Sequence, residues 1–222
     1  MSDQTPIVVF FYGGRWQSGQ RQDYVFVAHA LASQGICCVV PDYRLYPDVQ
    51  FPHFIDDGAR ALAWTASHID TYGGSADNIF VMGHSAGAHI AAMLALDLSV
   101  RQAALRGLIG LSGPYDFLPM RDEDVIAVFG DKFDSMETQP IHYAGPHAPP
   151  TLLITSRQDI VVRPRNAHRL ADALAGHGVH AETSLFANLT HVGTTLAVAA
   201  PMQWRAPVLE HVLTFIRQHA SS

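Results

Sequence analysis

Short apolar runs that recur along the chain place the strongest constraint on its fold. Strands buried on both faces of a parallel sheet are apolar throughout, whereas strands with one solvent face alternate. Five continuous runs and a sixth, later one predict strands at residues 7–12, 36–40, 78–83, 107–112, 151–155 and 180–186. The continuity of the first five favours strands that are covered on both sides.

Longer segments with helical periodicity separate these runs. They predict helices at residues 22–34, 53–69, 86–98, 164–176 and 206–219. Gly35 closes the first helix, and Pro164 stands where a first-turn proline is tolerated. The alternation predicts one α/β domain over residues 1–222, a doubly wound, mostly parallel sheet of about six strands with helices on both faces.

One segment interrupts this alternation. Residues 113–150 contain six prolines and an acidic stretch at 122–124, and they are too long for an ordinary connection. They predict an excursion above the sheet, partly helical at best. Loops at the carboxyl ends of parallel strands usually wall a ligand site, so we expect a small cap or site wall here.

Composition excludes several classes of partner. The net charge is −6 and Lys132 is the only lysine, so a nucleic-acid partner is not expected. No export-signal pattern opens the chain, and no apolar run approaches the ~20 residues that span a membrane. We therefore expect a soluble cytoplasmic protein as the chain stands, with no membrane span.

The metal-ligating residue types do not follow a metal-site spacing. Cys37 and Cys38 are adjacent in a predicted strand, where neighbours point to opposite faces, so we expect two small buried side chains and no bridge. The 13 histidines show no HExxH-like or paired-cysteine pattern. No metal and no cofactor are predicted.

The sequence Gly83-His84-Ser85-Ala86-Gly87 matches G-x-S-x-G between a predicted strand and a predicted helix. This context is the one a nucleophile elbow requires. A sharp turn needs small residues two before and two after the nucleophile, and the serine then stands at a helix N-terminus that favours negative charge. Ser85 is the candidate nucleophile.

A serine hydroxyl needs a base and an orienting acid. Asp159 follows the strand at 151–155, and His191 follows the last predicted strand, in the chain order Ser, Asp, His. Asp172 is a competing acid that falls within a predicted helix. The competing histidines are His168, His177 and His180.

Acyl transfer also needs donors for a developing oxyanion. The N–H of Ala86 is the first candidate, and the second belongs to Gly13 or Gly14, which follow the first strand. Glycine allows a substrate to approach the main chain. The flanking residues Tyr12, Trp16 and His84 are candidate substrate-binding residues, although we expect Tyr12 to support the loop.

These motifs together resemble the α/β-hydrolase fold, and within it the carboxylesterases related to hormone-sensitive lipase and the kynurenine formamidase-like group. YGGRWQSG resembles the family's His-Gly-Gly segment, and VVPDYRLYPDVQFPHFIDD its Asp-Tyr-Arg-Leu-x-Pro-Glu segment. The resemblance covers nearly the whole chain. It implies a structural role for residues 42–47 and a hydrolytic role for Ser85, Asp159 and His191.

The sequence differs from that family in three ways, and the last two lead to structural predictions. Tyr12 replaces the usual histidine, and Arg15 stands where lipase-like members have a third glycine. The chain begins at the oxyanion strand, so we expect an exposed sheet edge at residues 7–11, which a second subunit would cover in a homodimer. Only residues 113–150 are available as a cap, which predicts an open, shallow cleft and a preference for short acyl chains.

The leading hypothesis is a serine esterase that cleaves small, short-chain carboxylic esters through an acyl-enzyme intermediate. The alternative is an arylformamidase acting on N-formylkynurenine-like substrates, suggested by Gly-Gly-x-Trp-Gln and by His89. A third hypothesis, from a different class, is a non-catalytic binding protein on a hydrolase fold.

Overall fold

Six parallel strands form one sheet in the computed structural model, which describes residues 5–221. Their order across the sheet is β2-β1-β3-β4-β5-β6. The strands are β1 (Ile7–Phe11), β2 (Cys37–Val39), β3 (Ile79–His84), β4 (Gly107–Leu111), β5 (Thr151–Ser156) and β6 (Ala181–Phe186). All neighbouring pairs are parallel, so the carboxyl ends of all six strands lie at one edge of the sheet. The predicted doubly wound parallel sheet is confirmed.

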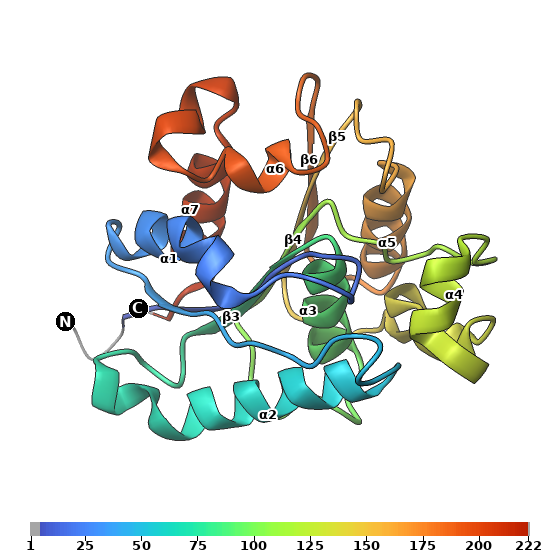
Figure 1. Ribbon diagram of the computed structural model, residues 1–222. Coiled ribbons are helices and arrows are strands. Elements are labelled where there is room, and N and C mark those ends of the chain that lie inside the picture. The colour runs from blue at the N-terminus through green and yellow to red at the C-terminus, as the bar shows by residue number, and fades with distance from the viewer. Residues whose placement is uncertain (1–4, 222) are drawn as a thin grey trace.

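Helices cover both faces of this sheet. They are α1 (Val25–Ala32), α2 (His53–His68), α3 (Ala86–Leu96), α4 (Glu123–Phe129), α5 (Arg165–Gly176), α6 (Gly193–Leu196) and α7 (Val208–His219). Helices α1 and α7 lie on one face, and α2, α3 and α5 lie on the other (Figure 1). The five predicted helices are present, although the first begins with a 3₁₀ turn at Arg21–Tyr24. The short helix α6 was not predicted.

The predicted sheet edge at residues 7–11 is wrong. Strand β1 pairs with β2 on one side and with β3 on the other, and all five of its residues are buried. The edge on that side is β2, whose three residues are only half-buried. A long, wholly apolar strand belongs in the interior, where both neighbours pair with its backbone. The premise for dimerisation through residues 7–11 is therefore removed.

The half-burial of β2 also corrects the expectation for the cysteines. Cys37 and Cys38 are free thiols, and both are half-buried rather than fully buried. Burial raises the pKa of Cys38 to about 12, so this thiol is protonated at neutral pH. Within residues 5–221, no helix is long and apolar enough to cross a membrane.

The excursion at residues 113–150 contains α4 and several 3₁₀ turns, in agreement with the expected partly helical segment. Asp122 caps α4, because its carboxylate accepts hydrogen bonds from the N–H groups of Asp124 and Val125. The same carboxylate pairs with Arg15 at 2.8 Å. The excursion is thereby tied to the loop that follows β1.

Candidate active site

Ser85 lies on a sharp turn between β3 and α3. Its φ of 53° and ψ of −120° fall in a region that side chains rarely adopt. A Cβ on Gly83 would collide with the Gly87 backbone, and one on Gly87 would collide with the Phe11 carbonyl. Gly83 is therefore needed for the turn, as the sequence pattern predicted, whereas Gly87 is needed because the turn packs against the backbone of β1. Ala86 begins α3, so its N–H has no intrahelical partner.

The structure brings Ser85, His191 and Asp159 together from three separate loops. His191 Nε2 lies 2.8 Å from Ser85 Oγ, and His191 Nδ1 lies 2.8 Å from Asp159 Oδ2. The Asp159 side chain is fully buried, and that of His191 is 12% exposed. All three loops follow strand ends at the carboxyl edge of the sheet, namely those of β3, β5 and β6.

The hydrogen bonds fix the direction of proton donation. An ionised carboxylate only accepts, so Nδ1–H of His191 donates to Asp159, and Nε2 of the neutral ring can accept the Ser85 proton. Asp159 Oδ1 also accepts the N–H groups of Val161 and Val162, at 3.0 and 2.9 Å. Burial raises the pKa of Asp159, but the hydrogen bonds from His191 and the Val162 N–H outweigh burial and lower it overall. Asp159 is therefore ionised at neutral pH.

Two side chains hold the His191 main chain in place. Its carbonyl oxygen accepts a hydrogen bond from His84 Nε2 at 3.1 Å and another from Thr194 Oγ1 at 2.8 Å. Ser112 Oγ lies 3.0 Å from Thr194 Oγ1, and Ser112 follows β4 with a φ of 49°. Thr194 and Ser112 were not singled out from the sequence. The only sequence feature that could have indicated them is their position: Ser112 ends a predicted strand, and Thr194 lies three residues after His191.

His84 is a positioning neighbour in this arrangement. It is 3% exposed, and burial, with the nearby His191, lowers its pKa to about 3. The ring is thus neutral at neutral pH and is a poor proton acceptor. The structure places it behind the His191 backbone rather than on a free surface.

The loop after β1 lies against the nucleophile. A Cβ on Gly13 would be 2.8 Å from His84 Nδ1 and 3.1 Å from the Ser85 Cβ. Gly14 has a φ of 137°, and a Cβ there would collide with the Ser18 carbonyl. The loop backbone therefore approaches Ser85 closely only because glycines occupy these positions.

Tyr12 is packed beneath that loop. It is 1% exposed, its ring stacks on Tyr43 at 4.6 Å, and its hydroxyl lies 3.2 Å from Asp42 Oδ1. Its own carbonyl accepts the Tyr43 hydroxyl at 2.8 Å. Burial raises the pKa of Tyr12 to about 12. These contacts agree with the expected supporting role and leave little surface for a substrate.

Trp16 joins an aromatic cluster that includes His89, which lies one helical turn after Ser85 on α3. The cluster comprises Trp16, Phe54, His89, Phe117 and Phe129. His89 is fully buried, its N–H bonds the Ser85 carbonyl at 3.2 Å, and its Nε2 lies 2.8 Å from the Thr138 carbonyl. Burial lowers the pKa of His89 to about 4. The excursion thus contacts the cluster directly.

The competing residues lie outside this arrangement. Asp172, His168, His177 and His180 are all exposed. None of them takes part in the hydrogen bonds of Ser85 or His191 described above.

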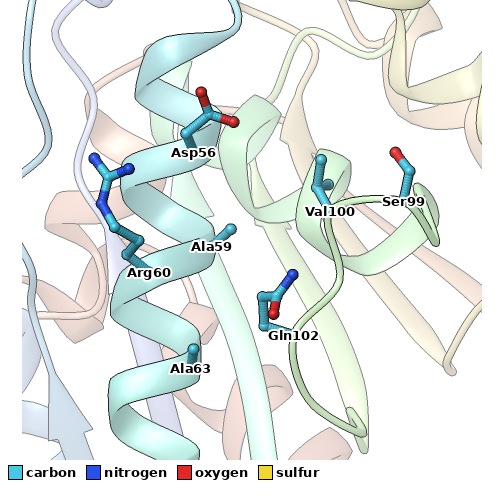
Figure 2. A pocket seen from close by; sticks show the side chains of 7 residues that line it. All are labelled: Asp56, Ala59, Arg60, Ala63, Ser99, Val100 and Gln102. Carbon is cyan, nitrogen blue, oxygen red and sulfur yellow. The ribbon is translucent and has the colours of Figure 1, made fainter.

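A separate surface hollow lies between α2 and residues 99–102 (Figure 2). It is lined by Asp56, Ala59, Arg60, Ala63, Ser99, Val100 and Gln102.

Comparison with protein families matches residues 1–174 to the BD-FAE family. The chain belongs to this family. The match includes Ser85 and Asp159 and ends before His191. The expected resemblance to α/β-hydrolase esterases is thereby confirmed at the level of family and fold.

Curated relatives and solved structures agree with this membership. A probable isoprenylcysteine alpha-carbonyl methylesterase, ICMEL1 of Oryza sativa subsp. japonica, is 25% identical over 240 residues, 95% of this chain and 56% of the relative. Esterase LipC of Mycobacterium tuberculosis is 28% identical over 194 residues, 76% of this chain and 48% of the relative. The chain thus spans about half the length of these curated relatives.

The fold of the chain matches that of Thermogutta terrifontis esterase 2 in its apo form. The TM-score is 0.83 at 21% identity, and the match covers 99% of this chain and 86% of that structure. This similarity is one of fold. The relatives described here are named as esterases, so the arylformamidase alternative receives no support from them.

Proposed function

We propose that this BD-FAE family chain is a carboxylesterase in which Ser85, His191 and Asp159 act as a catalytic triad. The observation that carries the proposal is the continuous hydrogen-bonded chain from Ser85 Oγ through His191 to Asp159, both distances being 2.8 Å. A serine on a strained turn, a neutral imidazole and a buried carboxylate are the parts that acyl transfer needs.

The reaction proceeds in two proton-balanced halves. Ser85 Oγ attacks the ester carbonyl while His191 Nε2 takes the serine proton, and His191 then returns that proton to the departing alkoxide. Water enters and gives a proton to His191, the resulting hydroxide attacks the acyl-enzyme, and Ser85 recovers its proton as the acid leaves. Asp159 stabilises the imidazolium that forms in each half.

The oxyanion is held by the N–H groups of Ala86 and Gly14, with Gly13 as a further candidate. Ala86 offers a free N–H at the start of α3, where the helix dipole also favours negative charge. A Cβ on Gly13 would lie 3.1 Å from the Ser85 Cβ, so the loop backbone runs close to the nucleophile. Losing one such donor typically costs about 3 kcal/mol of transition-state stabilisation.

The preferred acyl groups are short. Rings of the aromatic cluster are packed edge to face around His89, which lies one helical turn after Ser85. Trp16 and Phe129 are 5.0 Å apart, and Trp16 and His89 are 5.2 Å apart. Protein interiors packed in this way leave little free volume. A long acyl chain would have to displace these rings, whereas an acetyl or butyryl group would not.

Two assays on the intact chain test this function. A fluorophosphonate should label the wild type but not Ser85→Ala, and Ser85→Ala should retain its far-UV circular dichroism and melting temperature. On p-nitrophenyl esters from acetyl to decanoyl, kcat/KM should be greatest for the short acids. Turnover by Ser85→Ala, or labelling elsewhere, would overturn the triad; a maximum at decanoyl would overturn the acyl preference alone.

A further inference from the structure

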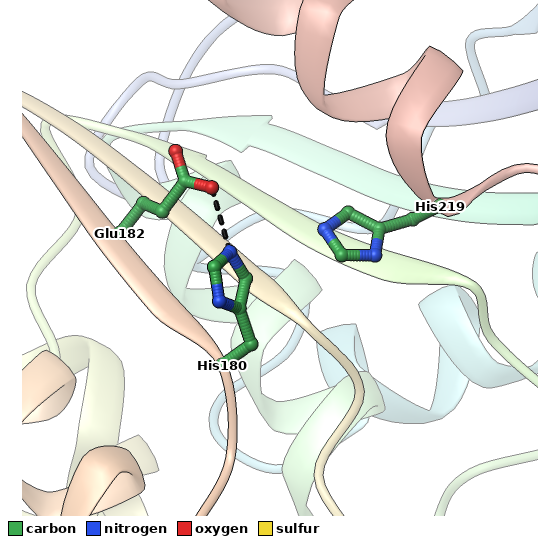
Figure 3. A group of neighbouring side chains, drawn as sticks. All are labelled: His180, Glu182 and His219. Carbon is green, nitrogen blue, oxygen red and sulfur yellow. Dashed lines mark hydrogen bonds and ion pairs between the residues drawn. The ribbon is translucent and has the colours of Figure 1, made fainter.

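A second cluster of chemically reactive side chains lies at the opposite edge of the sheet. His180 directly precedes β6, Glu182 is the second residue of β6, and His219 ends α7 (Figure 3). The triad occupies the carboxyl edge, and β6 begins at the amino edge because all strands are parallel. One ligand atom from each of these three residues lies within 4.8 Å of the other two.

The strand geometry places two of the three side chains on one side. Residues two apart on a strand point to the same face, and His180 Nε2 lies 2.6 Å from Glu182 Oε1. Figure 3 shows the ring of His219 directed toward this pair from the end of α7. The ring centroids of His180 and His219 are 5.3 Å apart.

His219 presents an unsatisfied polar atom at this place. Its Nε2 is buried and has no hydrogen-bond partner among the described residues. A buried polar atom without a partner costs about 1–3 kcal/mol. Phe215 packs against the same ring at 4.6 Å, so the ring is held in its orientation by its own helix.

We propose that His180, Glu182 and His219 form a site for a divalent transition-metal ion, best suited to Zn²⁺, that fastens the end of α7 to strand β6. Two imidazoles and one carboxylate are ligands that Zn²⁺ uses, whereas Mg²⁺ and Ca²⁺ prefer all-oxygen sites. Water completes the coordination from the side of His180, which is exposed.

The movement required is small. Ligand atoms around a tetrahedral Zn²⁺ are separated by about 3.4 Å, since each bond is about 2.0–2.1 Å long. The His180–Glu182 contact of 2.6 Å would open by less than an ångström by this measure. No other pair of ligand atoms is more than 4.8 Å apart, so none would have to close by more than about 1.4 Å. Rotation of the exposed His180 and partly exposed Glu182 side chains supplies shifts of this size.

The charge state also suits a metal ion. Each imidazole has a ring nitrogen that can offer a lone pair, and His219 Nε2 is engaged by none of the described residues. Glu182 supplies the one negative charge. The sequence spacing predicted no metal site, because the three ligands come from two elements that are distant along the chain.

Zinc binding to the chelator-treated, intact chain tests the site. We expect one Zn²⁺ per chain by calorimetry and a melting temperature that rises with Zn²⁺ concentration, because the ion binds only the folded arrangement. Co²⁺ should give the visible absorption of a tetrahedral site, and Mg²⁺ should give no rise in melting temperature. Absence of binding, or of the thermal shift, would overturn the proposal.

Variants locate the binding to these residues. Glu182→Gln, His180→Ala and His219→Ala should each raise the zinc dissociation constant at least about tenfold. His177→Ala, an exposed histidine beyond α5, is the matched control and should bind as the wild type does. The first two variants remain informative if His219→Ala fails to fold. Equal zinc affinity in Glu182→Gln and His180→Ala would place the ion elsewhere and refute the site.

Discussion

The two edges of the sheet differ in how completely their polar groups are paired. At the carboxyl edge, Ser85, His191 and Asp159 form a continuous chain of hydrogen bonds. At the amino edge, His180 and Glu182 pair with each other, while His219 keeps a buried ring nitrogen without a partner in the described chain. The first arrangement is fully paired, and the second leaves one ring nitrogen available to the proposed metal ion.

This difference shows two ways of preparing a site. Transition-state stabilisation needs groups that are already oriented, since reorganisation during the reaction would raise the barrier. A metal site needs only a set of lone pairs within reach, because the binding energy of the ion draws the ligands together. The two edges are therefore expected to respond to different perturbations, and to do so independently.

Asp159→Asn should produce the largest loss at the carboxyl edge. The asparagine amide can donate to His191 Nδ1, which favours the tautomer with its proton on Nε2 and removes the base from Ser85. We expect kcat on p-nitrophenyl acetate to fall about 10,000-fold, by analogy with other triads. Zinc binding at the amino edge should not change.

Asp172→Asn is the control for that substitution, since Asp172 is the competing acid and is exposed on α5. It should retain wild-type kcat and melting temperature. A comparable loss of kcat in Asp172→Asn, or full activity in Asp159→Asn, would show that the acid has been assigned to the wrong residue.

Gly14→Ala should produce the next largest loss. A methyl group there meets the Ser18 carbonyl, and φ of 137° is unfavourable for alanine, so the loop must move away from Ser85. Loss of one oxyanion donor should lower kcat about 100- to 1,000-fold with little change in KM. Steady-state kinetics on p-nitrophenyl acetate measures both values.

Gly35→Ala separates backbone strain from the loss of the donor. Gly35 also has a positive φ, 78°, but a methyl group there meets no atom within 4 Å. It should cost roughly 1 kcal/mol of stability and leave kcat unchanged. If both variants lost activity equally, the proposed role of the Gly14 N–H would be wrong.

The sequence predicted which side chains meet at the carboxyl edge because much of that arrangement is encoded locally. Gly83 is required by the Gly87 backbone across the turn and Gly87 by the backbone of the neighbouring strand β1, so the elbow is visible as a pattern of five residues. Asp159 and His191 were found from their positions after predicted strands, since parallel strands place all their carboxyl ends together. The structure places His191 within hydrogen-bond distance of both Ser85 and Asp159.

Features that depend on spatial order were not predictable in this way. The position of β1 inside the sheet follows from where the β1–β2 crossover places β2, and an edge assigned from chain position alone was wrong. The supporting contacts of Thr194 and Ser112 depend on loop conformation. The cluster at His180, Glu182 and His219 joins a strand to a helix, and no spacing of residues along the sequence indicates that these two elements lie side by side.

The buried imidazole of His89 should make stability dependent on pH. Its pKa is about 4 in the folded chain and near 6.5 when unfolded, so protonation favours the unfolded state. Above about pH 6.5 this histidine does not lower the free energy of unfolding. As the pH falls toward 4, its protonation lowers the free energy of unfolding by roughly 3 kcal/mol in total. Chemical denaturation at pH 7 and pH 4.5 measures the loss.

His89→Gln removes the titration and keeps an N–H donor for the Thr138 carbonyl. The variant should lose less stability than the wild type between these two pH values. Parallel losses in both proteins would mean that other groups dominate acid unfolding. Zinc binding, measured at pH 7, should be the same in the variant because the cluster lies at the other edge.

Thr194→Val should give the smallest effect, because it removes only one of two donors to the His191 carbonyl. His84 still holds that carbonyl at 3.1 Å, so the imidazole should become less well positioned without being released. One hydrogen bond of about 1–1.5 kcal/mol corresponds to a kcat lowered about tenfold, with KM unchanged. Kinetics on p-nitrophenyl acetate, together with the melting temperature, distinguishes lost positioning from lost stability.

Thr195→Val is the matched control, because the neighbouring Thr195 hydroxyl is buried and has no hydrogen-bond partner among residues 5–221. Replacing an unpaired hydroxyl by a methyl group should leave kcat unchanged and keep or raise the melting temperature. If Thr194→Val kept full kcat, the hydrogen bond from Thr194 to the His191 carbonyl would not be needed to position the imidazole. If both variants lost kcat equally, the loss would reflect packing of α6 rather than the hold on His191.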